Sequence, residues 1–188
     1  MTIIGMWPPG RPDMILKLKR TPGIYLLGFM ASGKTTIGKA VADRLGWSFA
    51  DLDQEIENQH STTIADIFGQ FGEPHFRDIE SDAIRRHIAK VEAGHPWVIA
   101  LGGGAVLRPE NWELIQNNGV TVWLDCPLHM IRRRLGDDVT RPLARDRAGL
   151  AKLYGVRRPL YARADFRIEI DSDDANDTAQ RILRLPIF

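Results

Sequence analysis

Residues 28–35 have the composition of a loop that binds phosphate. Gly28 is followed by four residues and then by Gly33, Lys34 and Thr35, which is the spacing of a phosphate-binding loop. Glycines let the backbone turn so tightly that successive N–H groups point at phosphate oxygens, and the helix that follows directs its positive end at the same anions. Lys34 would then reach the β- and γ-phosphates, and the hydroxyl of Thr35 would bind Mg²⁺. The loop therefore predicts a protein that uses a nucleoside triphosphate.

Acids and glycines follow two further apolar segments. Asp51 and Asp53 come after residues 47–50, and three glycines at residues 102–104 follow the apolar residues 97–101. Phosphoryl transfer needs the nucleotide held, the charge of the moving group neutralised and the acceptor aimed in line. Asp51 is well placed to hold magnesium through water, and Asp53 could orient an acceptor hydroxyl and take its proton. The alternative is that both are solvated acids at the start of a helix, favoured by the helix dipole.

Three arginines could serve the acceptor or the moving phosphoryl group. Arg77 lies three residues before an acid on a predicted helix, where a surface ion pair is the simpler explanation and would contribute only about 0.3 to 0.5 kcal/mol. Arg157 could likewise be a solvated basic residue, but two arginines near a cleft could clamp a carboxylate with forked hydrogen bonds. Arg141 lies in a charged segment that could fold over the nucleotide. Spacing alone places none of them.

The apolar pattern indicates strands that alternate with helices. Helices are predicted directly after the phosphate loop, from a cap at residues 63–66, from Pro74, and later in the chain at residues 111–117, 127–135, 150–163 and from a cap at Ser172 to about residue 185. Strands are predicted at residues 24–27, 47–50, 97–101, 120–124 and 166–170. This alternation predicts a three-layer α/β/α fold with a mostly parallel five-stranded sheet. Ligands bind outside the carboxyl ends of such strands, so the loop, the two acids and the three glycines should meet.

The whole chain has the composition of one soluble domain. It has 188 residues, 26% of them charged and 44% hydrophobic, with a formal net charge of +1, so nothing indicates a nucleic-acid or membrane surface. No apolar stretch approaches the roughly 20 residues that span a bilayer, and we expect a cytoplasmic location. Cys126, the single cysteine, is predicted to be a structural thiol. Residues 1–22 are expected to form a poorly ordered extension of a domain at residues 23–188, and the histidine spacing predicts no structural metal.

Seven motifs, in order and in register, resemble the shikimate kinase family over about residues 24–185. The first is the phosphate loop, in which Ala31 stands where the family often has glycine. The others lie at residues 51–53, 61–68, 72–80, 102–105, 141–143 and 157–161.

This resemblance implies transfer of the γ-phosphoryl group of ATP to the 3-hydroxyl of shikimate, a step in the synthesis of aromatic amino acids. Mg²⁺ would be held by Thr35 and Asp51, and residues 136–149 would form a lid. Asp53 would be the base, Lys34 and Arg141 would stabilise the transferred group, and Arg134 would lie near the adenine. The implied nucleotide-binding residues are Met30, Ala31, Ser32, Gly33, Lys34, Thr35, Thr36, Arg134 and Arg141. The implied shikimate-binding residues are Asp53, Arg77, Gly102, Gly103, Gly104 and Arg157.

Two other functions share some of these features. A related small-molecule kinase, such as one for gluconate, would share the phosphate loop, but the paired Arg77 and Arg157 favour shikimate. A kinase-like ligand sensor would bind an aromatic acid without catalysis, but such a sensor could lose residues that this chain keeps, among them Lys34 and Asp53. We expect a monomer with shikimate as its small-molecule partner.

Overall fold

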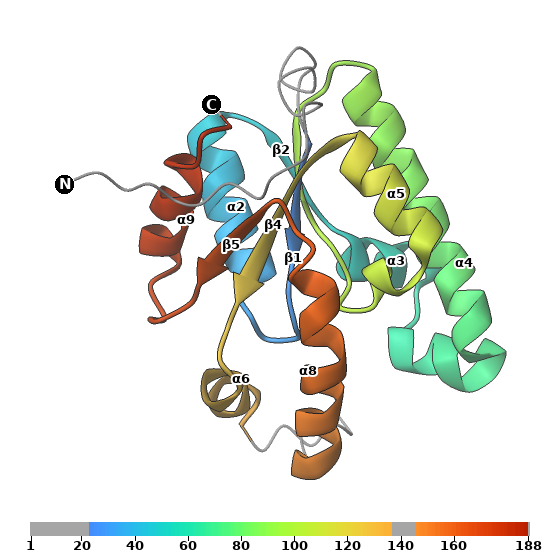
Figure 1. Ribbon diagram of the computed structural model, residues 1–188. Helices are drawn as coiled ribbons and strands as arrows, with labels where there is room; N and C mark the ends of the chain where they lie inside the picture. Colours follow the sequence, from blue (N-terminus) through green and yellow to red (C-terminus); the bar gives the residue numbers. More distant parts are fainter. Residues whose placement is uncertain (1–22, 137–145, 188) are drawn as a thin grey trace.

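The computed structural model describes residues 23–136 and 146–187 (Figure 1). The predicted extension at residues 1–22, and Arg141 with most of the predicted lid, lie outside the described residues. A parallel five-stranded sheet in the order β2-β3-β1-β4-β5 forms the centre of the molecule. Its strands are β1 (Gly23–Leu27), β2 (Ser48–Asp51), β3 (Trp97–Ala100), β4 (Gly119–Asp125) and β5 (Phe166–Glu169). The predicted fold class and all five strands are confirmed.

Helices cover both faces of the sheet and make the outer two layers (Figure 1). On one face lie α2 (Lys34–Leu45) and α9 (Ala175–Leu183), which pack together. On the other lie α4 (Ile64–Glu92), α5 (Pro109–Asn117) and α8 (Arg147–Tyr161). The shorter elements are α3 (Leu52–His60), which packs on α4, the 3₁₀ turn η1 (Ala105–Leu107) and α6 (Leu128–Leu135). No helix within these ranges is long and apolar enough to cross a membrane.

The central strands are buried on both faces. Every residue of β1 and of β4 is buried, and Leu26, Ile99 and Leu124 have no exposed surface. Continuous apolar runs are typical of parallel strands that helices cover on two sides. The same runs made these strands visible in the sequence.

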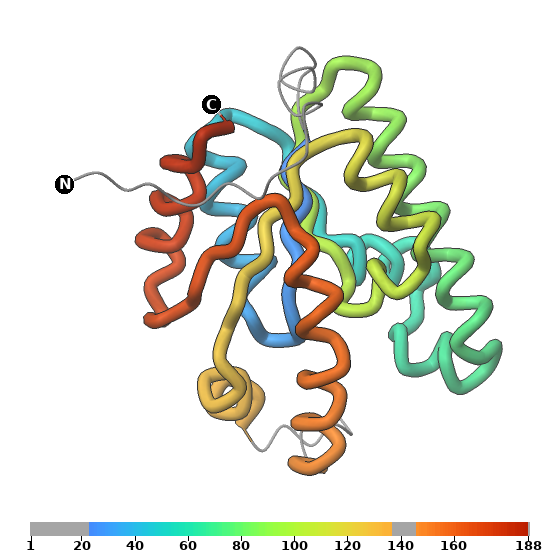
Figure 2. The backbone as a smooth tube through the Cα atoms, in the orientation of Figure 1, coloured from blue at the N-terminus to red at the C-terminus, as the bar shows by residue number. Residues whose placement is uncertain are grey.

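The strand register brings the candidate residues to one edge of the sheet. Leu26 lies opposite Ala100 of β3 and Val122 of β4. The carboxyl ends of the three central strands therefore lie at the same edge of the sheet. In Figure 2 the turn after β1, which is the phosphate loop, and the turn after β3, which holds residues 102–104, lie at the same lower edge. The predicted meeting of these segments at the carboxyl ends of the strands is confirmed.

Local hydrogen bonds decide where several helices begin. The predicted cap at Thr63 is confirmed, because its hydroxyl oxygen accepts a hydrogen bond from the Asp66 N–H at 3.1 Å. α4 is broken at Gly72, where φ is 80°, and the predicted second helix starts at Pro74 just beyond this break. The predicted cap at Ser172 is wrong. The carboxylate of Asp174 accepts from the N–H groups of Asn176 and Asp177 instead, since a charged oxygen is the stronger acceptor.

The described part of the predicted lid is partly helical. The sequence places the start of a helix at about residue 150, but α8 begins at Arg147. The carboxylate of Asp146 accepts a hydrogen bond from the Gly149 N–H at 2.8 Å and so caps the first turn. Residues 147–149 of the predicted lid therefore belong to α8.

Candidate active site

The phosphate loop adopts a conformation that depends on its glycines. Gly28 has a φ of 151°, and a Cβ atom there would lie 2.8 Å from both the carbonyl oxygen of Leu124 and the hydroxyl oxygen of Ser32. Gly33 has a φ of 97°, and Ala31 also has a positive φ, of 57°. Ser32 points inward with no exposed surface, and its N–H donates to the Phe29 carbonyl at 3.2 Å. Of the predicted nucleotide-binding residues that the structure describes, Ser32 is the one that does not line the cavity.

The side chain of Lys34 folds back from the C-terminal end of the phosphate loop and hydrogen-bonds to its start. Its Nζ donates to the carbonyl oxygens of Gly28 and Phe29, both at 3.0 Å. These two carbonyls belong to the turn that leaves β1. The ammonium group thus lies where the phosphates of a nucleotide would be held by the loop.

Thr35 and Asp51 face each other beside Lys34. The Thr35 hydroxyl donates to Oδ2 of Asp51, whose Oδ1 accepts from the Gln54 N–H at 3.3 Å. Asp51 therefore caps α3, as the simpler interpretation predicted, but its carboxylate also lines the cavity. A hydroxyl and a carboxylate are the hard oxygen ligands that Mg²⁺ prefers, so this pair fits the predicted metal.

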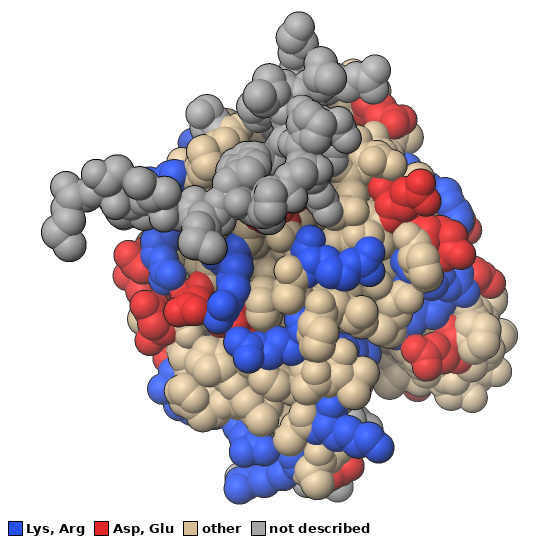
Figure 3. All heavy atoms as spheres, in the orientation of Figure 1, with Lys and Arg blue, Asp and Glu red and all other residues tan. Residues whose placement is uncertain are grey.

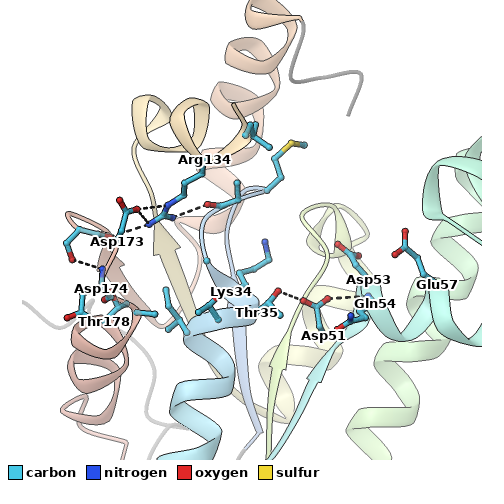
Figure 4. Close-up of a pocket in the computed structure, with 18 residues that line it drawn as sticks. Lys34, Thr35, Asp51, Asp53, Gln54, Glu57, Arg134, Asp173, Asp174 and Thr178 are labelled. Atoms are coloured by element: carbon cyan, nitrogen blue, oxygen red, sulfur yellow. Dashed lines mark hydrogen bonds and ion pairs between the residues drawn. The ribbon is translucent and has the colours of Figure 1, made fainter. Parts of the chain in front are cut away.

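A cavity of about 640 Å³ joins the loop to the acids of α3. Figure 4 shows Lys34 and Thr35 near its middle, Asp53 and Glu57 on one side, and Arg134 with Asp173 on the other. This volume lies within the range of small-molecule sites. The cavity is lined by Met30, Ala31, Gly33, Lys34, Thr35, Thr36, Ile37, Asp51, Asp53, Gln54, Glu57, Arg134, Leu135, Ser172, Asp173, Asp174, Ala175 and Thr178.

The three glycines after β3 make room for charged side chains from two helices. A Cβ atom on Gly102 would lie 2.5 Å from Oδ1 of Asp53 on α3 and 2.7 Å from Oε1 of Glu80 on α4. A Cβ atom on Gly104 would overlap the guanidinium group of Arg77, also on α4. Because nothing larger than hydrogen fits, the backbone and these charges are in direct contact.

The middle glycine is approached from α8. A Cβ atom on Gly103 would lie 3.1 Å from an amino nitrogen of Arg157. The Tyr161 hydroxyl donates to the Gly103 carbonyl at 2.5 Å. Burial raises the pKa of Tyr161 to about 12, so this hydroxyl keeps its proton at neutral pH.

Arg77 is buried, which contradicts the interpretation as a surface ion pair. Its guanidinium group binds Glu80 at 2.7 Å and Glu73 at 2.8 Å, and only 8% of the residue is exposed. Burial lowers the pKa of Arg77, but the two carboxylates raise it by more, so the group stays charged. Helical spacing identified the acid partner at Glu80 but could not show that the pair faces inward.

Burial raises the pKa of Asp53 above its usual range. The carboxylate of Asp51 raises it further, while the ammonium group of Lys34 opposes the shift. Burial also raises the pKa of Glu80 despite the neighbouring Arg77. A carboxylate with a raised pKa binds a proton more tightly, which is the property that a general base requires.

Comparison with known proteins identifies the family. The profile of the family described as shikimate kinase matches residues 30–185. The shikimate kinase of Synechococcus elongatus is 43% identical over 166 residues, covering 86% of this chain and 85% of that protein. The chain belongs to the shikimate kinase family. The shikimate kinase of Persephonella marina is 39% identical over 161 residues, which cover 85% of this chain and 96% of its own. The structure of Acinetobacter baumannii shikimate kinase in complex with shikimate has a TM-score of 0.80 and 37% identity, covering 87% of this chain and 92% of that one.

In this member of the shikimate kinase family the structure brings most of the predicted site residues together. Arg141 lies outside the described residues. Two neighbours of the site, Tyr161 and Asp173, were not predicted from the sequence. Tyr161 follows Arg157 by four residues on the same helix, which is a detectable signal. Asp173 gave no such signal, because it comes from a turn far along the chain.

Arg134 forms the wall of the cavity away from Asp53. It donates to the Ala31 carbonyl at 3.0 Å and pairs with Asp173 at 2.9 Å. Figure 3 shows further Lys and Arg side chains at this lower end of the molecule, over α6 and α8. Such a concentration of positive charge favours the approach of a polyphosphate.

Proposed function

We propose that this protein transfers the γ-phosphoryl group of ATP to the 3-hydroxyl of shikimate. The observation that carries the proposal is the convergence of Asp53, Arg77 and Arg157 on the glycine turn at residues 102–104, beside a phosphate loop closed by Lys34. Membership of the shikimate kinase family supports the choice of acceptor.

The phosphate loop and Lys34 are proposed to hold the triphosphate. Lys34 donates to two loop carbonyls at 3.0 Å, and it would exchange these for phosphate oxygens that carry full charge. Thr35 and Asp51 would hold Mg²⁺, which when bound neutralises phosphate charge during the transfer. Arg134 is proposed to face the adenine, because it lines the end of the cavity away from Asp53.

Asp53 is proposed to act as the base. Its carboxylate would accept the proton of the 3-hydroxyl while the oxygen of that hydroxyl forms its bond to the γ-phosphorus and the bond to the ADP oxygen breaks. Its raised pKa and its place between Lys34 and the glycine turn support this role. Arg141 remains part of the proposal, as a second cation for the transferred group.

Arg77 and Arg157 are proposed to bind the carboxylate of shikimate. The Arg77 guanidinium faces Gly104 and that of Arg157 faces Gly103, so the two cations flank the same turn. Two guanidinium groups can hold one carboxylate with forked hydrogen bonds. The expected monomeric state remains a proposal. The single cysteine leaves the chain without an internal disulfide, which supports a cytoplasmic location.

A coupled ADP-release assay tests the proposal. The purified protein should turn over ATP with Mg²⁺ and shikimate, and turnover should stop when EDTA removes the metal. Quinate and gluconate serve as competing acceptors in the same assay. If shikimate is not phosphorylated, the proposed kinase activity is wrong. If gluconate is phosphorylated at the same rate, the proposed acceptor is wrong.

A further inference from the structure

The helix that carries Asp53 is too short to hold its own position. α3 has nine residues, and only Leu52 and Ile56 on it are buried. Isolated helices of this length are not stable in water. Contacts with the rest of the protein must therefore fix where Asp53 lies.

One of these contacts is a buried histidine on α4. His87 is 1% exposed, and its Nε2 lies 2.6 Å from Oε2 of Glu55, two residues beyond Asp53 on α3. The edge of its ring packs against Trp97 of β3, with ring centres 4.9 Å apart. The side chain of His87 thus contacts α3, which begins at the site, and β3, which ends there.

Burial favours the neutral imidazole of His87. It lowers the pKa of the ring, Glu55 opposes this shift, and Lys90 and Arg86 lower the pKa further, so that the pKa lies below its usual value. The neutral ring donates its Nε2 proton to Glu55, because a carboxylate oxygen accepts hydrogen bonds. Nδ1 has no hydrogen-bond partner in the described part of the chain. Arg86 supports the same contact, because it lies 3.9 Å from Glu55 and donates to Gln59 of α3 at 2.9 Å.

The helix that holds His87 also presents Glu80 and Arg77 to the glycine turn. The carboxylates of Asp53 and Glu80 approach Gly102 from the two helices, so small movements of α3 relative to α4 change the distance between them. A contact that joins α3 to α4 therefore sets the geometry of the acceptor site.

We propose that His87 and Glu55 are positioning residues for phosphoryl transfer, which fix α3 on α4 and thereby aim Asp53 at the acceptor. This inference rests on the proposed function. Neither side chain lines the cavity, so both would act through Asp53.

Kinetics of paired variants test the inference. His87→Leu and Glu55→Ala should each lower kcat/KM for shikimate by about 10- to 100-fold, the cost of a misplacement near 1 Å, with KM for ATP within about twofold of the wild type. The double variant should be no worse than either single variant, because both remove one contact. His87→Gln, whose amide can still donate a hydrogen bond to Glu55, should keep most of the wild-type kcat/KM for shikimate.

The exposed ion pair between Arg85 and Asp82 on α4 provides a matched control. Its atoms lie 2.5 Å apart with both side chains more than half exposed, and Arg85→Ala should leave the kinetics unchanged. If His87→Leu lowers thermal stability but leaves kcat/KM for shikimate at the wild-type value, the pair is only structural and the inference is wrong. Additive losses in the double variant would also overturn it.

Hydrogen exchange separates this inference from the proposed function. In the protein without ligands, His87→Leu should speed amide exchange in α3 at least tenfold while exchange in α2 is unchanged. This measurement needs no activity, so it applies even if the wild type fails to phosphorylate shikimate. Unchanged exchange in α3 would reject the positioning role.

Discussion

Gly102→Ala should strongly lower kcat/KM for shikimate without changing the binding of ATP. The new methyl group would lie 2.5 Å from Oδ1 of Asp53 and 2.7 Å from Oε1 of Glu80. Ordinary van der Waals contact begins near 3.4 Å, so Asp53 must move by about 0.9 Å. A misplacement of this size costs about 100-fold in rate. The φ angle at Gly102 is one that alanine adopts freely, so the effect comes from the displaced carboxylates and not from backbone strain.

Gly103→Ala is the matched control for this prediction. Its methyl group would lie 3.1 Å from the nearest atom, a nitrogen at the end of the Arg157 side chain, which has to move by only about 0.3 Å. In an assay with saturating ATP we expect a loss in kcat/KM for shikimate of about 100-fold for Gly102→Ala and of less than about tenfold for Gly103→Ala. KM for ATP should be unchanged in both variants. Equal losses in the two variants, or a loss that appears in KM for ATP, would refute the reasoning.

Three further outcomes follow from the site and its supports. Asp53→Asn should keep ATP affinity, measured by calorimetry, within about threefold while kcat falls at least 100-fold, because the amide cannot accept the acceptor's proton. Ala31→Gly should raise the melting temperature by about 2 °C, since a left-handed non-glycine residue costs about 1 to 2 kcal/mol and the added glycine entropy offsets part of that gain; an unchanged or lower value would contradict this. Burial lowers the pKa of His87 below its unfolded value of 6.5, so the unfolded chain binds the proton more tightly and the free energy of unfolding should fall as pH drops below about 6.5. Urea unfolding across pH 5 to 7.5 should show a smaller fall for His87→Gln, and an identical slope would contradict the assignment.

The phosphate loop and the strands could be predicted because local rules determine them. Gly28 has a positive φ of 151°, which favours glycine, and the apolar runs of β1 and β4 match their burial on both faces. These signals lie within a few neighbouring residues. The parallel arrangement of the strands and the helices on both faces followed from general rules for alternating strands and helices, whereas the order of the strands along the sheet was not predicted.

The sequence could not show which side chains meet across the fold. Arg77 has an acid three residues away, but exposed and buried pairs share that spacing, and only the packing of α4 makes this one buried. The predicted cap at Ser172 is wrong because the carboxylate of Asp174, the stronger acceptor, caps the final helix. Serine and aspartate are both common caps, so the sequence alone does not choose between them. The contact between Tyr161 and Gly103 joins residues 58 positions apart, and no local pattern predicts it.

The two arginines at the glycine turn are not equivalent. Arg77 already binds the carboxylates of Glu73 and Glu80, so one positive charge there faces two negative ones. Arg157 keeps a buried Nε without a partner among the described residues. Its side chain lies beside the Tyr161 hydroxyl, and its charge acts on the Glu80 carboxylate only from a distance beyond an ion pair. We therefore expect an incoming carboxylate to gain more from Arg157, whose charge is less compensated, and we expect Arg77 chiefly to fix the position of Glu80 beside Asp53. On this proposal α4 builds the wall of the acceptor site, and α8 supplies most of its attraction for an anion.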